Sequence, residues 1–141
     1  MGRRDSRENA FKILYQADIQ KCNASELVDN FFEQNTIPQN DKLYIKEVIS
    51  GVDSNIEVID KCLSKSLKSW TLNRISKIDK AALRLALYEI MYKDDVPDSI
   101  AIYEAVELVK KYNTESAGGF VNGTLRAIAR QKDSSGEKSE D

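Results

Sequence analysis

The sequence predicts an all-α protein, and three observations support this. Apolar residues recur at helical spacing along the chain, without the sustained alternation that is typical of strands. The only two prolines, Pro38 and Pro97, separate segments that have this spacing. The chain has 141 residues, 41% of them hydrophobic, which is about one domain with a core of moderate size. We therefore expect a compact bundle of helices.

The first helix is predicted to begin near Ser6. Asp5 can accept hydrogen bonds from the open backbone amides of the first turn, and Glu8 completes the spacing of a capping box. Apolar residues then recur on one face: Ala10, Phe11, Leu14 and Ala17. This pattern predicts that the face packs against the core.

Three arginines lie within the first seven residues of a chain whose formal net charge is −2. Arg3 and Arg4 precede the predicted cap, so we expect them to reach outward. Arg7 stands one turn before Phe11, at the rim of the apolar face. Residues 1–12 hold four cations and two anions, a surplus of two. The sequence thus predicts a small basic patch on an otherwise acidic protein.

Two helices are predicted in the next segment. A short helix runs from Ser25 towards Gln34, and Pro38 closes the loop that follows. Asn40 then caps the longest apolar pattern of the chain. Its members recur at alternating steps of four and three residues: Ile45, Ile49, Val52, Ile56, Ile59 and Leu63. Gly51 within this helix costs about 1 kcal/mol relative to alanine and would permit the close approach of a neighbour.

The second half of the chain predicts three more helices. From Ile78 to Tyr92 apolar residues occupy nearly every direction, which indicates a central, largely buried helix. A further helix covers about 99–112, with an outer pair of Glu107 and Lys111. The last helix carries three inward residues: Val121, Leu125 and Ile128. Residues 132–141 are polar and are expected to form a disordered tail.

The chain has no convincing internal repeat and is better described as two helical halves. We expect helical subdomains over about 1–68 and 70–131, within one domain of residues 1–131. Trp70 lies between them and is predicted to be a core residue that joins the two halves.

Composition argues against several classes of function. The chain has no histidine, and its two cysteines, Cys22 and Cys62, are far apart, so a zinc site and general-base catalysis are not expected. Gly118 and Gly119 do not follow a strand, so they fit no phosphate-binding loop. No segment has the length of a membrane span or the pattern of a signal peptide. We expect a cytoplasmic, non-catalytic protein with reduced cysteines and no metal or cofactor.

Four segments of the chain stand out together. In order they are RRDSRENAFKILYQAD, SWTLNRISKIDKAALRLALYEI, DVPDSIAIYEAVELVKKY and FVNGTL. This ordered set resembles the NusB family of bacterial transcription antitermination factors. The resemblance covers about residues 3–130, and the order of the last three segments makes it specific. It implies a fold of about seven helices in two subdomains.

The resemblance also implies a function and partners. The protein would bind the boxA element of nascent ribosomal RNA together with the ribosomal protein NusE. This pair would help to assemble a complex on RNA polymerase, with other Nus factors, that reads through terminators. The sequence leaves the oligomeric state open, including a homodimer.

Five residues match the RNA-binding motifs that the resemblance implies. Arg3, Arg4 and Arg7 match the basic start and are expected to contact phosphates. The alternative is that Arg3 and Arg4 only increase solubility, and that Arg7 forms a salt bridge with Glu8 or with a neighbouring helix. The two others lie in the FVNG segment. Phe120 is either an RNA contact or a core residue, and Asn122, with Gly123, serves either helix packing or RNA binding.

Three residues are candidates for contact with NusE by the same resemblance. Asp79 matches an acidic position of the family and could instead be a helix cap. Tyr15 and Arg84 are weaker candidates, and Arg84 could simply pair with a buried carboxylate.

The sequence departs from the family pattern at two places. Gly119 stands before Phe120 where a cation is usual, and Tyr103 stands where asparagine is usual. These departures predict weak RNA binding without NusE. Two other classes remain open: a module that binds only protein, and the RNA-binding domain of a methyltransferase, to which NusB-like domains are also fused.

Overall fold

The protein is helical throughout the residues that the structure, a computed structural model, describes, which are 2–67 and 71–135. Seven α-helices and two short 3₁₀ helices make up these ranges. In chain order they are α1 (Arg3–Gln20), η1 (Ala24–Leu27), α2 (Val28–Gln34), α3 (Gln39–Ser54), α4 (Ile56–Ser66), η2 (Leu72–Arg74), α5 (Lys77–Tyr92), α6 (Asp98–Tyr112) and α7 (Glu115–Ser135). The prediction of an all-α fold is confirmed.

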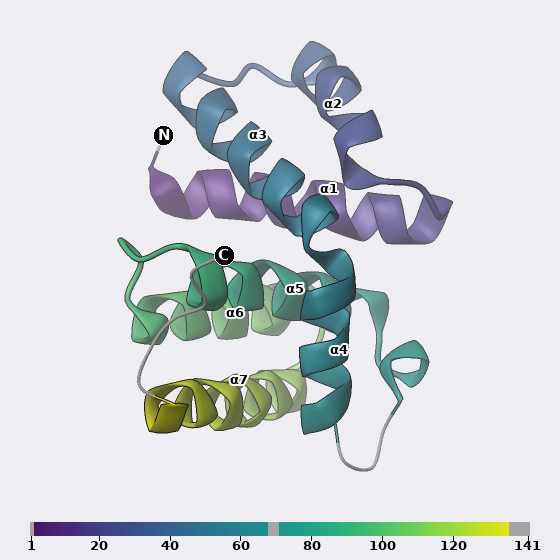
Figure 1. Cartoon of the computed structure of the whole chain (residues 1–141). Helices are drawn as coiled ribbons and strands as arrows, with labels where there is room; N and C mark the ends of the chain where they lie inside the picture. Colours follow the sequence, from purple (N-terminus) through teal and green to yellow (C-terminus); the bar gives the residue numbers. More distant parts are fainter. Residues whose placement is uncertain (1, 68–70, 136–141) are drawn as a thin grey trace.

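Helix α1 crosses the middle of the molecule and separates two groups of helices (Figure 1). Helices α2 and α3 lie on one side of it, and α5 and α6 lie on the other. Helix α7 packs on α6, and α4 packs on α5 and α7 rather than on the α2 side. The buried apolar side chains form one continuous core cluster that extends from α1 to α7. The start of α1 therefore lies where both groups of helices can contact it.

Helix α1 begins earlier than predicted. Its first residue is Arg3, with Gly2 as the N-cap, so the predicted capping box at Asp5 and Glu8 is wrong. The polar groups near the start have partners on other helices instead. Ser6 is buried and donates a hydrogen bond of 2.5 Å to Asp41 of α3. These tertiary contacts stabilise one more turn than the local sequence signal indicates, and they place the first arginines within the helix.

The longest predicted helix is in fact two. It breaks at Asn55, whose side-chain amide donates to the carbonyl of Gly51 over 2.7 Å. The apolar pattern continues across the break because both helices face the same core. The predicted close approach at Gly51 is confirmed, since a Cβ built there would lie 2.3 Å from a ring atom of Tyr88.

In the second half of the chain, the helices agree more closely with those predicted from the sequence. Helix α5 is largely buried, as predicted, and Ser76 caps it by accepting from the backbone N–H of Asp79. The ion pair predicted between Glu107 and Lys111 is wrong. Glu107 pairs with Lys110 instead, and Lys111 pairs with Glu8 of α1.

Helix α7 continues to Ser135, so the predicted tail begins too early: residues 132–135 are helical. Lys132 Nζ lies 2.5 Å from Asp98 of α6, which holds this last turn against the bundle. Residues 136–141 and Trp70 lie outside the described residues, and the division into 1–68 and 70–131 stays a prediction. Cys22 and Cys62 are free thiols and half-buried. Among the described residues, none of the helices combines the length and apolar character that a membrane span requires.

Candidate nucleic-acid interface

The first turns of α1 present three arginines to three different helices. Arg3 faces α3, Arg4 faces α6, and Arg7 faces α5. Adjacent residues of a helix do not share a face, which separates Arg3 from Arg4. Arg7 lies one turn further along the helix and meets Glu89 of α5. The three arginines that the sequence analysis grouped together therefore have three different environments.

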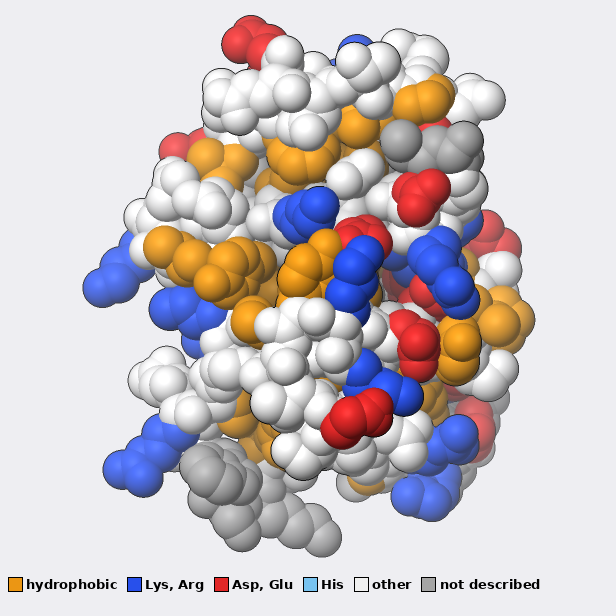
Figure 2. Space-filling model, turned by 180° about the vertical axis from the view of Figure 1, so that it is seen from behind, with side chains coloured by type: hydrophobic (Ala, Val, Ile, Leu, Met, Phe, Trp, Pro, Cys, Tyr) orange, Lys and Arg blue, Asp and Glu red, His pale blue; other side chains and the backbone are white. Residues whose placement is uncertain are grey.

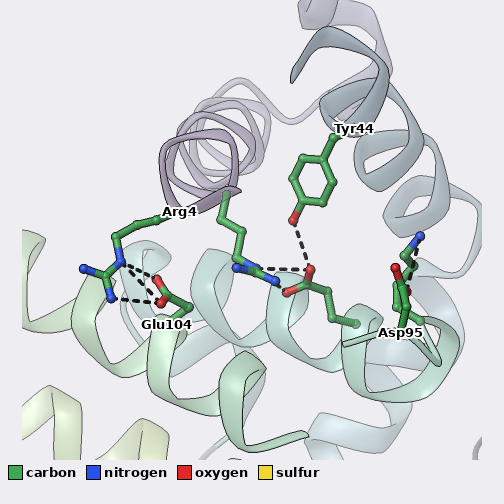
Figure 3. Close-up of polar contacts among 7 residues, drawn as sticks. Arg4, Tyr44, Asp95 and Glu104 are labelled. Atoms are coloured by element: carbon green, nitrogen blue, oxygen red, sulfur yellow. Dashed lines mark hydrogen bonds and ion pairs between the residues drawn. The ribbon is translucent and has the colours of Figure 1, made fainter. Parts of the chain in front are cut away.

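Arg7 belongs to a buried cluster, here called the buried trio: Arg7, Glu89 and Tyr44. The Arg7 Nε donates to Glu89 over 2.9 Å and 3.2 Å, and the Tyr44 hydroxyl donates to the same carboxylate over 3.0 Å (Figure 3). The residues are 7%, 1% and 6% exposed. Arg7 thus forms the salt bridge with a neighbouring helix that the sequence analysis kept as the alternative.

Burial and Glu89 shift the pKa values of Arg7 and Tyr44. Burial alone lowers the pKa of Arg7, but the hydrogen bond and the charge of Glu89 raise it above its ordinary value. Burial, followed by the charge of Glu89, raises the pKa of Tyr44, so its hydroxyl stays a proton donor. Arg7 is only 7% exposed and is engaged with Glu89, so its geometry favours a role in joining α1 to α5 rather than a phosphate contact.

Arg4 belongs to a cluster of the same residue types at the surface, here called the exposed trio: Arg4, Glu104 and Tyr103. Its guanidinium donates to the Glu104 carboxylate through Nε and Nη2, both over 3.0 Å (Figure 3). The hydrogen bond and charge of Glu104 raise the pKa of Arg4. The Arg4 side chain is nevertheless 63% exposed. It can therefore still contact an anion from solution.

Arg3 lies over the ring of Tyr44, with its Cζ 4.1 Å from the ring centroid. It is exposed, and it borders a cleft of about 270 Å³ between α3 and the loop that joins α5 to α6. Lys93 and Asp95 of this loop also line the cleft. Lys93 pairs with Glu47 over 2.7 Å. The cation at this cleft with the most open position is thus Arg3.

The FVNG segment lies on α7, and its first residue, Phe120, lines a second cleft. Phe120 is half-buried against the core and lines a cleft of about 330 Å³. Asn122 accepts a hydrogen bond of 3.0 Å from Arg126, one turn further along the helix. Gly123 is exposed, and a Cβ built there meets no atom of the described residues within 4 Å. Helix packing therefore does not explain the glycine, which leaves the surface open at this point.

The candidate partner residues have specific structural contacts. Asp79 is buried at the start of α5, accepts from Asn113 over 3.1 Å, and lines the same cleft as Phe120. Arg84 donates to both carboxylate oxygens of Asp60 over 2.8 Å, which is the pairing kept as its alternative, but the Asp60 side chain is 27% exposed rather than buried. Tyr15 is half-buried on α1 and packs on the core.

The structure thus brings together Arg3 and Arg4 at one end of α1, and Phe120 and Asp79 at another cleft. The sequence analysis did not single out Tyr44 or Glu104, and it noted Tyr103 only as a departure from a pattern. A signal for the buried trio was present, since a carboxylate in a buried helix requires a cationic partner. Figure 2 shows that, over the centre and right of the face seen there, Lys and Arg side chains lie among Asp and Glu side chains. A basic site on this protein is therefore local.

Comparisons with known proteins agree with this architecture. The NusB family model matches residues 4–130. The chain is 46% identical to the transcription antitermination protein NusB of Ruminiclostridium cellulolyticum, over 92% of this chain and 90% of the relative. It is 48% identical to the NusB of Acetivibrio thermocellus, over 94% and 91% of the two chains.

Solved structures give the same result. The T. maritima NusB superposes with a TM-score of 0.87 at 35% identity, covering 93% of this chain and 92% of that one. A crystal structure of the antitermination factors NusB and NusE in complex with double-stranded RNA superposes with a TM-score of 0.84 at 32% identity, covering 92% and 96%. Sequence and fold agree over nearly the whole chain, and this protein belongs to the NusB family.

Proposed function

We propose that the protein is a transcription antitermination factor that binds boxA RNA in nascent ribosomal transcripts together with NusE. The observation that carries this proposal is the pair of exposed arginines at the start of α1, on a scaffold shared with a NusB that is solved with NusE and RNA. The protein acts by recognition, without catalysis, in the cytoplasm. RNA polymerase and other Nus factors are indirect partners.

The RNA contacts follow from exposure and charge. Single-stranded RNA is held by cations along its phosphates and by aromatic faces under its bases. Arg3 and Arg4 are the exposed cations that reach the phosphates. Phe120 and Asn122 provide a second contact at the start of α7, and Arg7 supports the site from within the buried trio.

The NusE contact is proposed on the surface formed by α1 and α5. Asp18 of α1 lies within 4 Å of three cations of α5: Lys77, Lys80 and Arg84. This network joins the two helices, and Lys77 is its most exposed member. Asp79, Tyr15 and Arg84 are the proposed contact residues on or beside it.

The test is a titration of labelled boxA RNA with the protein, with and without NusE, at two salt concentrations. A scrambled RNA of the same length is the control. We expect tighter binding to boxA than to the scrambled RNA, with a further gain when NusE is present. If Arg3 and Arg4 each neutralise one phosphate, the logarithm of affinity falls with the logarithm of salt with a slope of roughly −1.4. Equal binding of the two RNAs, with NusE retained, would make the protein a protein-binding module.

A further inference from the structure

An exposed tyrosine adjoins the proposed phosphate contact. Tyr103 of α6 is 51% exposed, one of the large hydrophobic side chains that the fold leaves at the surface. Its ring centroid lies 5.7 Å from the Cζ of Arg4. The next residue along α6, Glu104, holds the Arg4 guanidinium through two hydrogen bonds. A fixed cation and an open aromatic face therefore stand side by side.

The position of Tyr103 is not explained by the core. Tyr44, the other tyrosine beside an N-terminal arginine, is buried, and its hydroxyl donates a hydrogen bond to Glu89. Tyr103 has about half of its surface in solvent, and Ile100, one turn earlier on α6, is 42% exposed. Together they give an apolar surface next to a cation, at the edge of the basic start of α1.

This combination has the chemistry that a single-stranded nucleic acid requires. Each nucleotide offers a π-face and a phosphate, and proteins bind both with an aromatic ring beside a cation. We propose that Tyr103 stacks on a base of the bound RNA while Arg4 contacts a phosphate of the same strand. The inference rests on the proposed function and adds a base contact to it. Glu104 then acts as a positioning residue, because it orients Arg4 beside the ring.

The experiment measures the affinity of fluorescently labelled boxA RNA for the protein in the presence of NusE. Tyr103→Ala and Tyr103→Asn remove the ring, and Tyr103→Phe keeps it. Val58→Ala is the matched control, because Val58 is 49% exposed on α4, away from the start of α1 (Figure 1). We expect at least about a fivefold loss of affinity for Tyr103→Ala and Tyr103→Asn, and values within about twofold of wild type for the other two variants.

Two further readouts distinguish stacking from other roles. Stacking neutralises no phosphate, so Tyr103→Ala should leave the salt dependence of binding unchanged, whereas Arg4→Ala should reduce its slope by about 0.7. RNA in which uridines are replaced by 5-bromouridine should crosslink to Tyr103 under ultraviolet light, and peptide mass spectrometry identifies the site. The melting temperatures of all variants check that the fold is retained.

The outcomes separate the two proposals. If the wild-type protein does not prefer boxA to scrambled RNA, the proposed function fails and this inference fails with it. If the wild type prefers boxA but Tyr103→Ala binds equally well, only the inference is overturned. A Tyr103→Ala variant that binds RNA normally alone but no longer responds to NusE would instead assign the tyrosine to a protein contact, which also overturns the inference.

Discussion

The buried trio and the exposed trio contain the same three residue types in different surroundings. In both, an arginine of α1 pairs with a glutamate of another helix and a tyrosine stands beside the pair. In the buried trio all three members are nearly inaccessible to solvent, whereas in the exposed trio the arginine and the tyrosine are open to it. Burial, and not residue type, therefore decides which arginine can hold the fold together and which can bind a ligand.

The largest expected effect comes from breaking the buried trio. Arg7→Ala removes the guanidinium that pairs with the Glu89 carboxylate in the core, so we expect it to lower the free energy of unfolding by about 3 to 5 kcal/mol. The matched variant Arg4→Ala removes a cation whose side chain is 63% exposed, and it should leave stability nearly unchanged. Urea unfolding followed by circular dichroism measures both. Equal stability of the two variants would contradict the distinction.

The tyrosines of the buried and exposed trios allow the same comparison of stability. Tyr44→Phe removes the hydroxyl that donates to Glu89 in the core, and we expect a loss of about 1 to 3 kcal/mol in the free energy of unfolding. Tyr103→Phe removes a hydroxyl at the surface, where water can replace its contacts, and should change stability little. Thermal unfolding of the two variants provides the measurement. A surface variant as unstable as the core variant would show that the exposed trio also supports the fold.

Much of the fold could be predicted from the sequence, and the failures have a common cause. Periodicity identified the helices because each buries an apolar face on the same core. The start of α1 was missed because a tertiary partner, Asp41 for Ser6, overrides the local capping signal. The break at Asn55 was missed because the apolar pattern continues across it. The candidate site shows the same limit. Sequence spacing placed the first arginines together, but it could not show that Arg7 meets a carboxylate 82 residues away.

The exposed arginines should affect RNA binding rather than stability. In the double variant Arg3→Ala, Arg4→Ala, we expect boxA affinity to fall on the order of tenfold at moderate salt, with a salt slope reduced by about 1.4. The slope is the more specific readout, because it counts neutralised phosphates. Fluorescence anisotropy at several salt concentrations measures both quantities. Wild-type affinity in the double variant would remove the start of α1 from the RNA site.

The smallest expected effect tests whether Glu104 restrains Arg4 by its charge. Glu104→Gln keeps an oxygen that can accept from Arg4 but removes a negative charge next to the proposed phosphate path. We expect the affinity for boxA to rise by about twofold to fivefold at low salt, and the gain to shrink at high salt because exposed charges are screened. Glu57→Gln, on the exposed face of α4, removes the same charge elsewhere and controls for net charge. An equal gain in both variants would mean that RNA responds to the overall charge of the protein. A loss of affinity in Glu104→Gln alone would mean that the orientation of Arg4 matters more than the repulsion it relieves.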